Sequence, residues 1–341
     1  MAILWPMTEP ADDARRAAGR FATGVSAVRP FGGGHINETF LVAAAGGELV
    51  LQRLNLAVFP DPDGLTANIA AVHRHLGGAL MPEPVPAEDG RWLARDGTGA
   101  WRAWRRVPDA APVAVSTPAA ARAAGHLLGR FHGGVAGLDP AALIETLPGF
   151  HDPAGRLAAL RAAVAADPHG RTAGVAAEIA AAEAGEGLAA LAAELSARLP
   201  RRVAHNDAKL DNVLFGASGE AVCLVDFDTL MPGAWFWDAG DLLRSAATPA
   251  AEDDPSATRD VALYRSVLDG YRSGAGGALT ADEGEALERA GAVVTYEQAV
   301  RFLTDWIRGD VYYRISRPGQ NLDRARAQFS LLASMPGGSS A

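Results

Sequence analysis

The fold is decided by the stretch His205-Asn206-Asp207-Ala208-Lys209-Leu210-Asp211-Asn212, which is followed along the chain by Val225-Asp226-Phe227-Asp228. In the pattern H-x-D-x-x-x-x-N, an Asp on a loop accepts the proton of an acceptor hydroxyl, and the later Asn presents an oxygen to magnesium. Those residues are Asp207 and Asn212, and we count Lys209 of the same loop among the catalytic residues. A carboxylate such as Asp226 suits a magnesium-nucleotide. The spacing therefore predicts a phosphoryl-transfer centre, with Asn212 and Asp226 as metal ligands.

Two short apolar runs lie between these motifs. Residues 213–215 and 221–225 are separated by a glycine-containing turn, which is typical of a hairpin. A hairpin would bring Asn212, just before the first strand, close to Asp226, at the end of the second. The plainer interpretation is that the carboxylates cap turns and the His fills a niche in the core. The joint pattern favours the catalytic interpretation.

Length and composition restrict the class of protein. A chain of 341 residues is long enough for two lobes or domains of ordinary size, and 49% hydrophobic with 21% charged residues is a globular profile. The net charge of -9 argues against a nucleic acid or an anionic membrane as partner, because such binding relies on clustered Lys and Arg. We expect a small-molecule partner, and a monomer or a simple homodimer.

The single cysteine and the N-terminal residues bear on the compartment. Cys223 lies in an apolar run, so no intramolecular disulfide can form and a reducing compartment is indicated. Residues 1–10 lack a basic region leading into an apolar run, and no uncharged apolar stretch approaches the ~20 residues that a spanning helix needs. The sequence therefore predicts a cytoplasmic protein.

The first third of the chain is rich in strand patterns. We expect antiparallel strands at 39–42 and 49–54, two more at 92–94 and 101–104, and a helix over 65–80. Two prolines in the segment 108–112 exclude a helix interior or a central strand there. We therefore place an N-lobe at 1–107, a linker at 108–115 and a helical C-lobe at 116–341.

Helix signals dominate the remainder. Thr117-Pro118 starts a helix, with Thr as the cap and Pro in the first turn. The Ala- and Glu-rich residues 156–199 predict exposed helices, and 264–271 and 292–313 predict two more. Trp235, Phe236 and Trp237 are expected in the core. The chain should end in a loose tail from Pro336.

A glycine run and a cation are candidates for the phosphates. Gly32, Gly33 and Gly34 lie between predicted strands, where backbone N–H groups can approach phosphate oxygens closely. On the strand 49–54, Gln52 and Arg53 must point to opposite faces, so only one of them can face the nucleotide. Arg is always charged and binds phosphate in a bidentate manner, which favours Arg53.

At these residues the chain resembles the aminoglycoside phosphotransferase and choline kinase superfamily, and within it the N-acetylhexosamine 1-kinase branch. Five blocks resemble that branch, namely 33–40, 51–55, 205–209, 226–233 and 301–305. The resemblance implies an α+β fold of two lobes similar to protein kinases, with a small antiparallel sheet and a larger, mainly helical lobe. It also implies phosphorylation by ATP and Mg²⁺ of a sugar hydroxyl, most directly the anomeric hydroxyl of an N-acetylhexosamine.

The same resemblance implies a sugar pocket, lined by His35, Asn206, Asp228, Arg301 and Tyr312. Buried polar side chains of this kind would discriminate against analogues that lack the matching hydroxyl or amide groups. A helix-packing ion pair and a core aromatic are the plainer interpretations of Arg301 and Tyr312. Asp238 and Asp241 look like the acids at a helix start that hold the catalytic loop.

One departure concerns the phosphate-binding cation. In protein kinases a Glu on the small-lobe helix orients it, yet no Asp or Glu occurs between Asp63 and Glu83. Asn68 or His73 could orient Arg53 instead. Other functions stay open: transfer to another hexose, an aminoglycoside or a choline-like amine, or an inactive pseudokinase that only binds ligands. A protein kinase is disfavoured, because no D-F-G or A-P-E segment follows Asp226.

Overall fold

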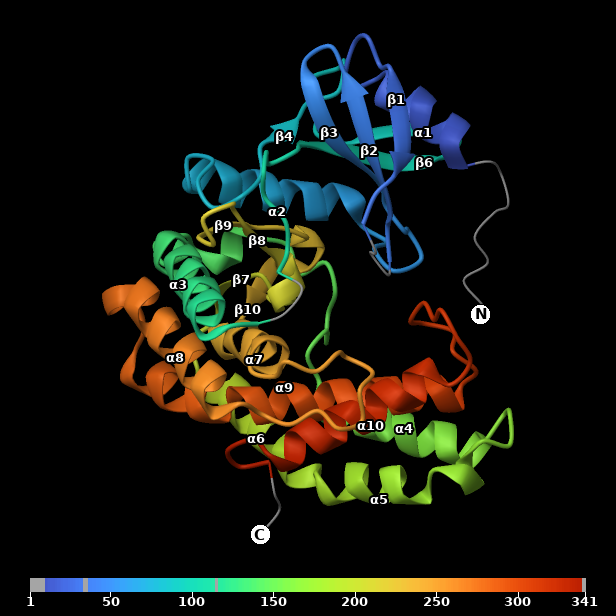
Figure 1. Ribbon diagram of the computed structural model, residues 1–341, viewed down its shortest axis with the longest axis vertical. Coiled ribbons are helices and arrows are strands. Elements are labelled where there is room, and N and C mark those ends of the chain that lie inside the picture. Colours follow the sequence, from blue (N-terminus) through green and yellow to red (C-terminus); the bar gives the residue numbers. More distant parts are fainter. Residues whose placement is uncertain (1–9, 33–35, 114–115, 339–341) are drawn as a thin grey trace.

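The computed structural model describes residues 10–32, 36–113 and 116–338 of the chain, which form two lobes (Figure 1). The N-lobe is a mainly antiparallel sheet in the order β1-β2-β3-β6-β4, with β5 paired to β6. Its strands are β1 (Ala27–Pro30), β2 (Glu38–Ala44), β3 (Gly47–Arg53), β4 (Pro84–Val85), β5 (Ala94–Asp96) and β6 (Gly99–Arg105). The predicted two-lobed α+β fold is confirmed, as is the antiparallel pairing of 39–42 with 49–54.

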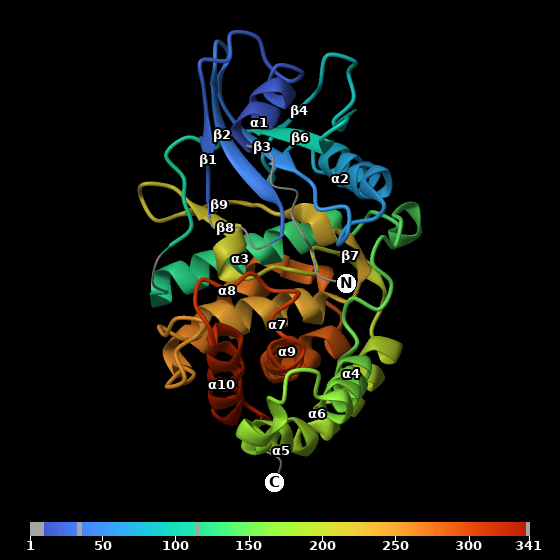
Figure 2. The ribbon, with the colours of Figure 1, turned by 90° about the vertical axis from the view of Figure 1, so that its right-hand side faces the viewer.

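Two helices cover opposite faces of this sheet (Figure 2). Helix α1 (Pro10–Ala18), which the sequence analysis did not predict, packs Ala14, Ala17 and Ala18 into the same core as Leu49, Leu51 and Trp101. Helix α2 (Pro62–His75) packs on the face that looks toward the C-lobe, through Leu65 and Ile69. It begins at the Asp61 cap and ends before Gly77 and Gly78, whose φ angles are positive. It is therefore shifted toward the N-terminus from the predicted 65–80.

The C-lobe is built from helices around two short strand pairs. The helices are α3 (Pro118–Val135), α4 (Pro153–Ala166), α5 (Ala176–Ala184), α6 (Glu186–Arg198), α7 (Trp235–Ala246), α8 (Val261–Ala275), α9 (Ala281–Ile307) and α10 (Gln320–Ala333). The strand pairs are β7 (Arg202–Ala204) with β10 (Met231–Gly233), and β8 (Val213–Phe215) with β9 (Ala221–Leu224). The Thr117 hydroxyl caps α3 by accepting from the N–H of Ala120, as predicted.

Two helix predictions need correction. Helices α4 and α6 are only half exposed, because each buries one row of side chains against α9, such as Leu160 and Leu195. Helix α9 ends at Ile307 rather than continuing to 313. Gly309 and Asp310 both have positive φ, which turns the chain away from the helix. Residues 311–313 consequently belong to a loop.

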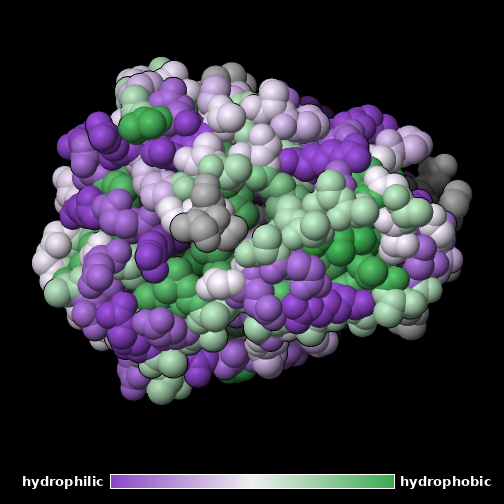
Figure 3. Space-filling view, turned by 90° about the horizontal axis from the view of Figure 1, so that it is seen from below, coloured by the Kyte–Doolittle hydropathy of each residue, from purple (hydrophilic) through white to green (hydrophobic). Residues whose placement is uncertain are grey.

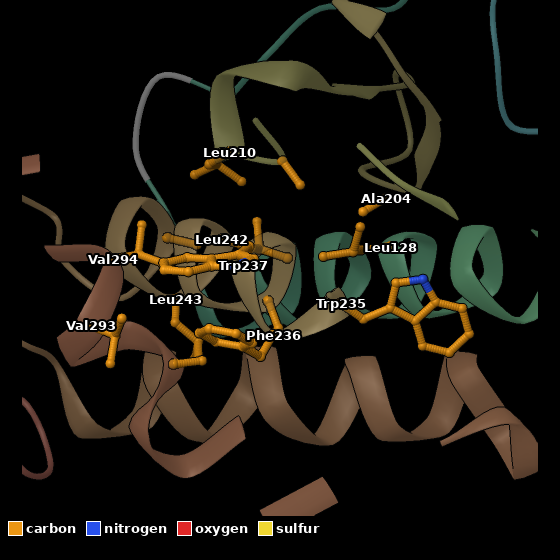
Figure 4. Close-up of a cluster of buried hydrophobic side chains, with 14 of the residues drawn as sticks. Leu128, Ala204, Leu210, Trp235, Phe236, Trp237, Leu242, Leu243, Val293 and Val294 are labelled. Atoms are coloured by element: carbon orange, nitrogen blue, oxygen red, sulfur yellow. The ribbon is translucent and has the colours of Figure 1, made fainter. Parts of the chain in front are cut away.

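The C-lobe core lies directly beneath the catalytic stretch. Figure 4 shows Trp235, Phe236 and Trp237 of α7 packed between α3 and α9, below Leu210. The indole N–H of Trp235 donates to the carbonyl of Val203 at 2.8 Å. The predicted core role of these three aromatic residues is therefore confirmed.

The surface at the C-lobe end intersperses polar and apolar residues (Figure 3). Within the described part of the chain, no helix is both long enough and apolar enough to cross a membrane.

Candidate active site

The catalytic loop follows β7, and Asp238 in the first turn of α7 fixes its backbone. The two carboxylate oxygens of Asp238 accept from the N–H groups of His205 and Asn206, at 2.8 and 2.5 Å. One of them also accepts from His132 Nε2 of α3 at 2.8 Å. Burial opposes ionisation, but these donors hold the pKa of Asp238 below its usual range. Asp238 thus holds the loop, as expected from its position at a helix start.

Asp241 stabilises the loop less directly. Its carboxylate pairs with Arg244, and its backbone carbonyl accepts from the Ser245 hydroxyl at 2.7 Å. That hydroxyl in turn accepts from the N–H of Leu210 at 2.8 Å. The expected structural role therefore operates through Ser245 and not through the Asp241 side chain.

Asp207 lies within hydrogen-bonding distance of two partners from its own loop. Lys209 Nζ is 2.9 Å and Asn212 Nδ2 is 3.0 Å from Asp207 Oδ2. Burial would raise the pKa of Asp207, but the Lys209 charge and these hydrogen bonds lower it. The carboxylate is therefore ionised at neutral pH and able to orient a hydroxyl group.

Asn212 and Asp226 meet through the β8–β9 hairpin, as predicted. Val213 pairs with Leu224, and the N–H of Val225 donates to the Asn212 carbonyl at 2.9 Å. His205 joins both parts, because its Nε2 lies 2.9 Å from the Val225 carbonyl and its Nδ1 accepts from the N–H of Asp207 at 3.3 Å. Asp207 lies close enough to Asp226 for their charges to interact.

Asp226 is the exposed carboxylate of the site. Its φ is +66°, and its side chain is exposed, whereas Asp228 two residues later is buried. Desolvation by the surrounding protein, with the charges of Asp228 and Asp207, raises the pKa of Asp226 to about 6.

The donor set suits a small hard cation. Among the described residues, no group of three or more His, Cys, Asp or Glu could hold a metal alone. The Nδ2 of Asn212 is bound to Asp207, which leaves its Oδ1 for a cation beside the Asp226 carboxylate. Mg²⁺ keeps few protein ligands and completes its shell with phosphate oxygens and water, so the residues present fit it.

Two residues predicted for the sugar pocket make contacts that hold the site together. Asp228 is buried. Its carboxylate forms an ion pair with Arg102 and accepts a hydrogen bond from Asn37, and both of these partners belong to the N-lobe. Asn206 is buried with φ of +63°, and its Nδ2 donates to three backbone carbonyls, those of Ala204, Thr229 and Met231. In this arrangement the Asp228 carboxylate and the Asn206 Nδ2 group have partners within the protein.

Arg301 and Tyr312 do meet near Asp207. The Arg301 guanidinium lies 5.9 Å from the ring centroid of Tyr312, and Phe150 and Tyr313 lie at 5.6 Å. Burial alone would lower the pKa of Arg301, but the neighbouring tyrosines, Glu297 and Asp207 raise it. Asp305 holds the loop that carries Tyr312 by accepting from the backbone N–H groups of 311–313.

The structure contradicts the placement expected for Arg53. Its guanidinium pairs with Glu38 of β2 at 3.3 Å and lies 5.7 Å from the Trp101 ring, within the core that α1 covers. Gln52 lies on the opposite face, toward the C-lobe. Gln52 and Arg53 thus point to opposite faces, as predicted, and Arg53 lies on the face away from the C-lobe. Neither Asn68 nor His73 orients Arg53: Asn68 bonds to Ile144 and Leu230, and His73 packs edge-on against Trp92.

Arg102 is a residue that the sequence analysis missed. It lies on β6 opposite Gln52, so it shares the face toward the C-lobe. The Gln52 Oε1 accepts from its Nε at 2.9 Å. The available signal was a single charge in the otherwise apolar run 100–104. Of the predicted glycine loop, Gly32 has φ of +73°, whereas Gly33, Gly34 and His35 lie outside the described residues.

Fold and site together define a two-lobed phosphotransferase. Residues 27–276 match APH, the phosphotransferase enzyme family. Because this match spans most of the chain, the protein belongs to that family. The family indicated by the sequence motifs is thereby confirmed.

Many solved structures share the fold, and three of them match nearly the whole chain as follows. Spectinomycin phosphotransferase in complex with ADP and spectinomycin is 12% identical, with TM-score 0.63 and coverage of 95% of this chain and 94% of that chain. An aminoglycoside phosphotransferase from Alicyclobacillus acidocaldarius is 15% identical, with TM-score 0.62 and coverage of 97% and 92%. The amicoumacin kinase hAmiN, in complex with AMP-PNP and Ca²⁺, is 15% identical, with TM-score 0.61 and coverage of 94% and 92%.

Proposed function

We propose that this protein transfers a phosphoryl group from ATP, with Mg²⁺, to a sugar hydroxyl. The acceptor that we favour is the anomeric hydroxyl of an N-acetylhexosamine or a related hexose. The observation that carries the proposal is that Asn212 bonds to the Asp207 carboxylate while the β8–β9 hairpin brings Asp226 beside Asn212. The ADP and AMP-PNP bound to two structures of the same fold support the nucleotide.

Each of the predicted catalytic and metal-binding residues has a role in this reaction. Asp207 orients the acceptor hydroxyl and accepts its proton, and Lys209, which stays charged beside it, stabilises negative charge. When bound, the metal neutralises charge on the phosphates, and Asn212 and Asp226 would hold it. Gly32, Gly33 and Gly34 are the backbone candidates around the phosphates.

The acceptor side favours a neutral sugar over a cationic amine. Arg301 is a permanent cation close enough to Asp207 for their charges to interact. It would repel an aminoglycoside or a choline-like acceptor, whereas it can donate to a sugar hydroxyl or an acetamido carbonyl. We propose Arg301, Tyr312 and His35 as sugar contacts. The branch resemblance supports the N-acetylhexosamine.

An aminoglycoside remains the alternative acceptor, because structures of the same fold include a spectinomycin phosphotransferase and an aminoglycoside phosphotransferase. A pseudokinase would have lost the base or a metal ligand, and this chain retains both. A panel of N-acetylhexosamines, plain hexoses and aminoglycosides, followed by phosphorus NMR of the products, tests the acceptor and the modified position together. Phosphorylation of an aminoglycoside but of no sugar would overturn the proposed acceptor.

Replacing Asp207 by Asn tests the reaction centre. Loss of a general base costs about 10²- to 10⁴-fold in rate, so turnover should fall by that factor while ATP still binds. The matched control is Asp211→Asn, because Asp211 is an exposed acid of the same loop. Equal turnover in the Asp207 variant and the control would refute the assignment.

A further inference from the structure

We propose that Arg102 is the N-lobe cation that binds the nucleotide phosphates, in the role first expected of Arg53. The inference rests on the proposed function, since it presupposes a nucleoside triphosphate in the cleft. It assigns to Arg102 of β6 the phosphate-binding role that we had expected of Arg53 on the neighbouring strand β3.

The placement of Arg102 directs its guanidinium toward the C-lobe. Gln52 Oε1 accepts both from Arg102 Nε, at 2.9 Å, and from Trp104 Nε1, at 3.1 Å. The guanidinium also lies 5.5 Å from the Trp104 ring centroid. With Nε fixed against the sheet, the two terminal nitrogens extend from the sheet to Asp228 of the C-lobe.

The terminal nitrogens lack hydrogen-bond partners. The Arg102 side chain is only 4% exposed. Among the described residues, neither NH1 nor NH2 makes a hydrogen bond of good geometry, although NH2 contacts the Asp228 carboxylate as an ion pair. A buried guanidinium with unused donors is costly unless a ligand completes it. Phosphate oxygens match the fork of donors, so the geometry points to a phosphate group.

The neighbours of Arg102 are the other groups that a triphosphate requires. Asp228, its ion-pair partner, also accepts a hydrogen bond from Asn37, which follows the predicted glycine loop closely in sequence. Asp226, the proposed metal ligand, lies close enough for the Arg102 charge to lower its pKa in part. A phosphate group bound beside Asp226 would therefore meet the Arg102 charge and could accept from the unpaired NH1 group, while NH2 keeps its contact with Asp228.

The role of Arg102 is tested by measuring nucleotide binding in the absence of turnover. Dissociation constants of ATP, ADP and adenosine are measured by calorimetry for the wild type, Arg102→Gln and Arg53→Gln. We expect Arg102→Gln to weaken ATP at least tenfold and adenosine less than twofold, and Arg53→Gln, on the other face of the sheet, to leave both within twofold. Equal losses for ATP and adenosine, or a larger effect at Arg53, would overturn the inference.

Two further variants separate phosphate binding from a merely structural link between the lobes. Asp228→Asn breaks the same ion pair but keeps the cation, so the preference for ATP over adenosine should persist; its loss would show that the pair and not Arg102 matters. Arg102→Lys keeps the charge and should recover most of the ATP affinity, which also covers a failure of Arg102→Gln to fold. If the wild type binds no adenine nucleotide, the proposed function fails before the role of Arg102 is tested.

Discussion

Asp226 and Asp228 show how two identical side chains, two residues apart, acquire different tasks. Asp226 has a positive φ and is exposed, while Asp228 is buried against Arg102. Desolvation, together with the charges of Asp228 and Asp207, raises the pKa of Asp226 to about 6. Because the folded protein disfavours the ionised form of Asp226, this carboxylate lowers the stability of the ligand-free protein. A bound cation would offset that loss.

This cost predicts that Asp226→Asn stabilises the ligand-free protein at pH 7.5. A raised pKa means that the folded protein holds the proton more tightly than the unfolded chain. The protonated Asp226 therefore contributes its full stabilisation below about pH 4, and this contribution is lost as the pH rises through about 6. Thermal unfolding should show a higher Tm for the variant at pH 7.5 and a smaller difference at pH 5. The exposed Asp211→Asn is the control, and a Tm difference that does not depend on pH would contradict the explanation.

At the scale of elements, the closest packing in the C-lobe is that of α3 on α8. Glycines at matching intervals let the two backbones touch. A Cβ at Gly125 or Gly129 would lie 2.3 Å from a carbonyl oxygen of α8, and one at Gly270 or Gly274 would lie 2.1 Å from a carbonyl oxygen of α3. This contact places His132 of α3 against Tyr271 of α8 and against Asp238, which holds the catalytic loop.

We therefore expect Gly129→Ala to destabilise the protein by about 1–3 kcal/mol or more, because backbone must move to admit the methyl group. Gly284 in α9 has nothing within 4 Å of its virtual Cβ. Gly284→Ala should instead stabilise by about 0.5–1 kcal/mol through helix propensity. Chemical denaturation of both variants checks the pair. Similar losses at the two positions would mean that helix contact is not the cause.

The sequence predicted those features that arise from short segments. The loop 205–212 and the hairpin after it are contiguous, so their spacing alone placed Asn212 beside Asp226. Arg102 could not be found in this way, because only the cross-strand register with Gln52 brings it to the site. The end of α9 at Ile307 depends on Asp305 binding the N–H groups of 311–313, a local device that periodicity does not report. The close contact of α3 with α8 likewise exists only in three dimensions.

At the scale of the whole molecule, Asn68 of α2 joins the two lobes. Its Nδ2 donates to the carbonyls of Ile144 and Leu230, at 2.7 and 2.9 Å, and its Oδ1 accepts from the N–H of Ile144 at 2.8 Å. Leu230 lies four positions after Asp226, at the end of the turn that follows it. Helix α2 is therefore tied to the segment that positions the metal ligand.

Removing this tie by Asn68→Ala should leave buried backbone groups without partners, at a cost of about 1–3 kcal/mol. Because α2 and the turn after Asp226 would then move independently, amide hydrogen exchange should accelerate in 62–75 and 227–230 together, and Mg²⁺-dependent ATP binding should weaken. The matched control is Thr66→Ala, since among the described residues the Thr66 hydroxyl bonds only to the Pro62 carbonyl of its own helix. Faster exchange confined to α2, with the turn unchanged, would show that Asn68 does not couple the two lobes.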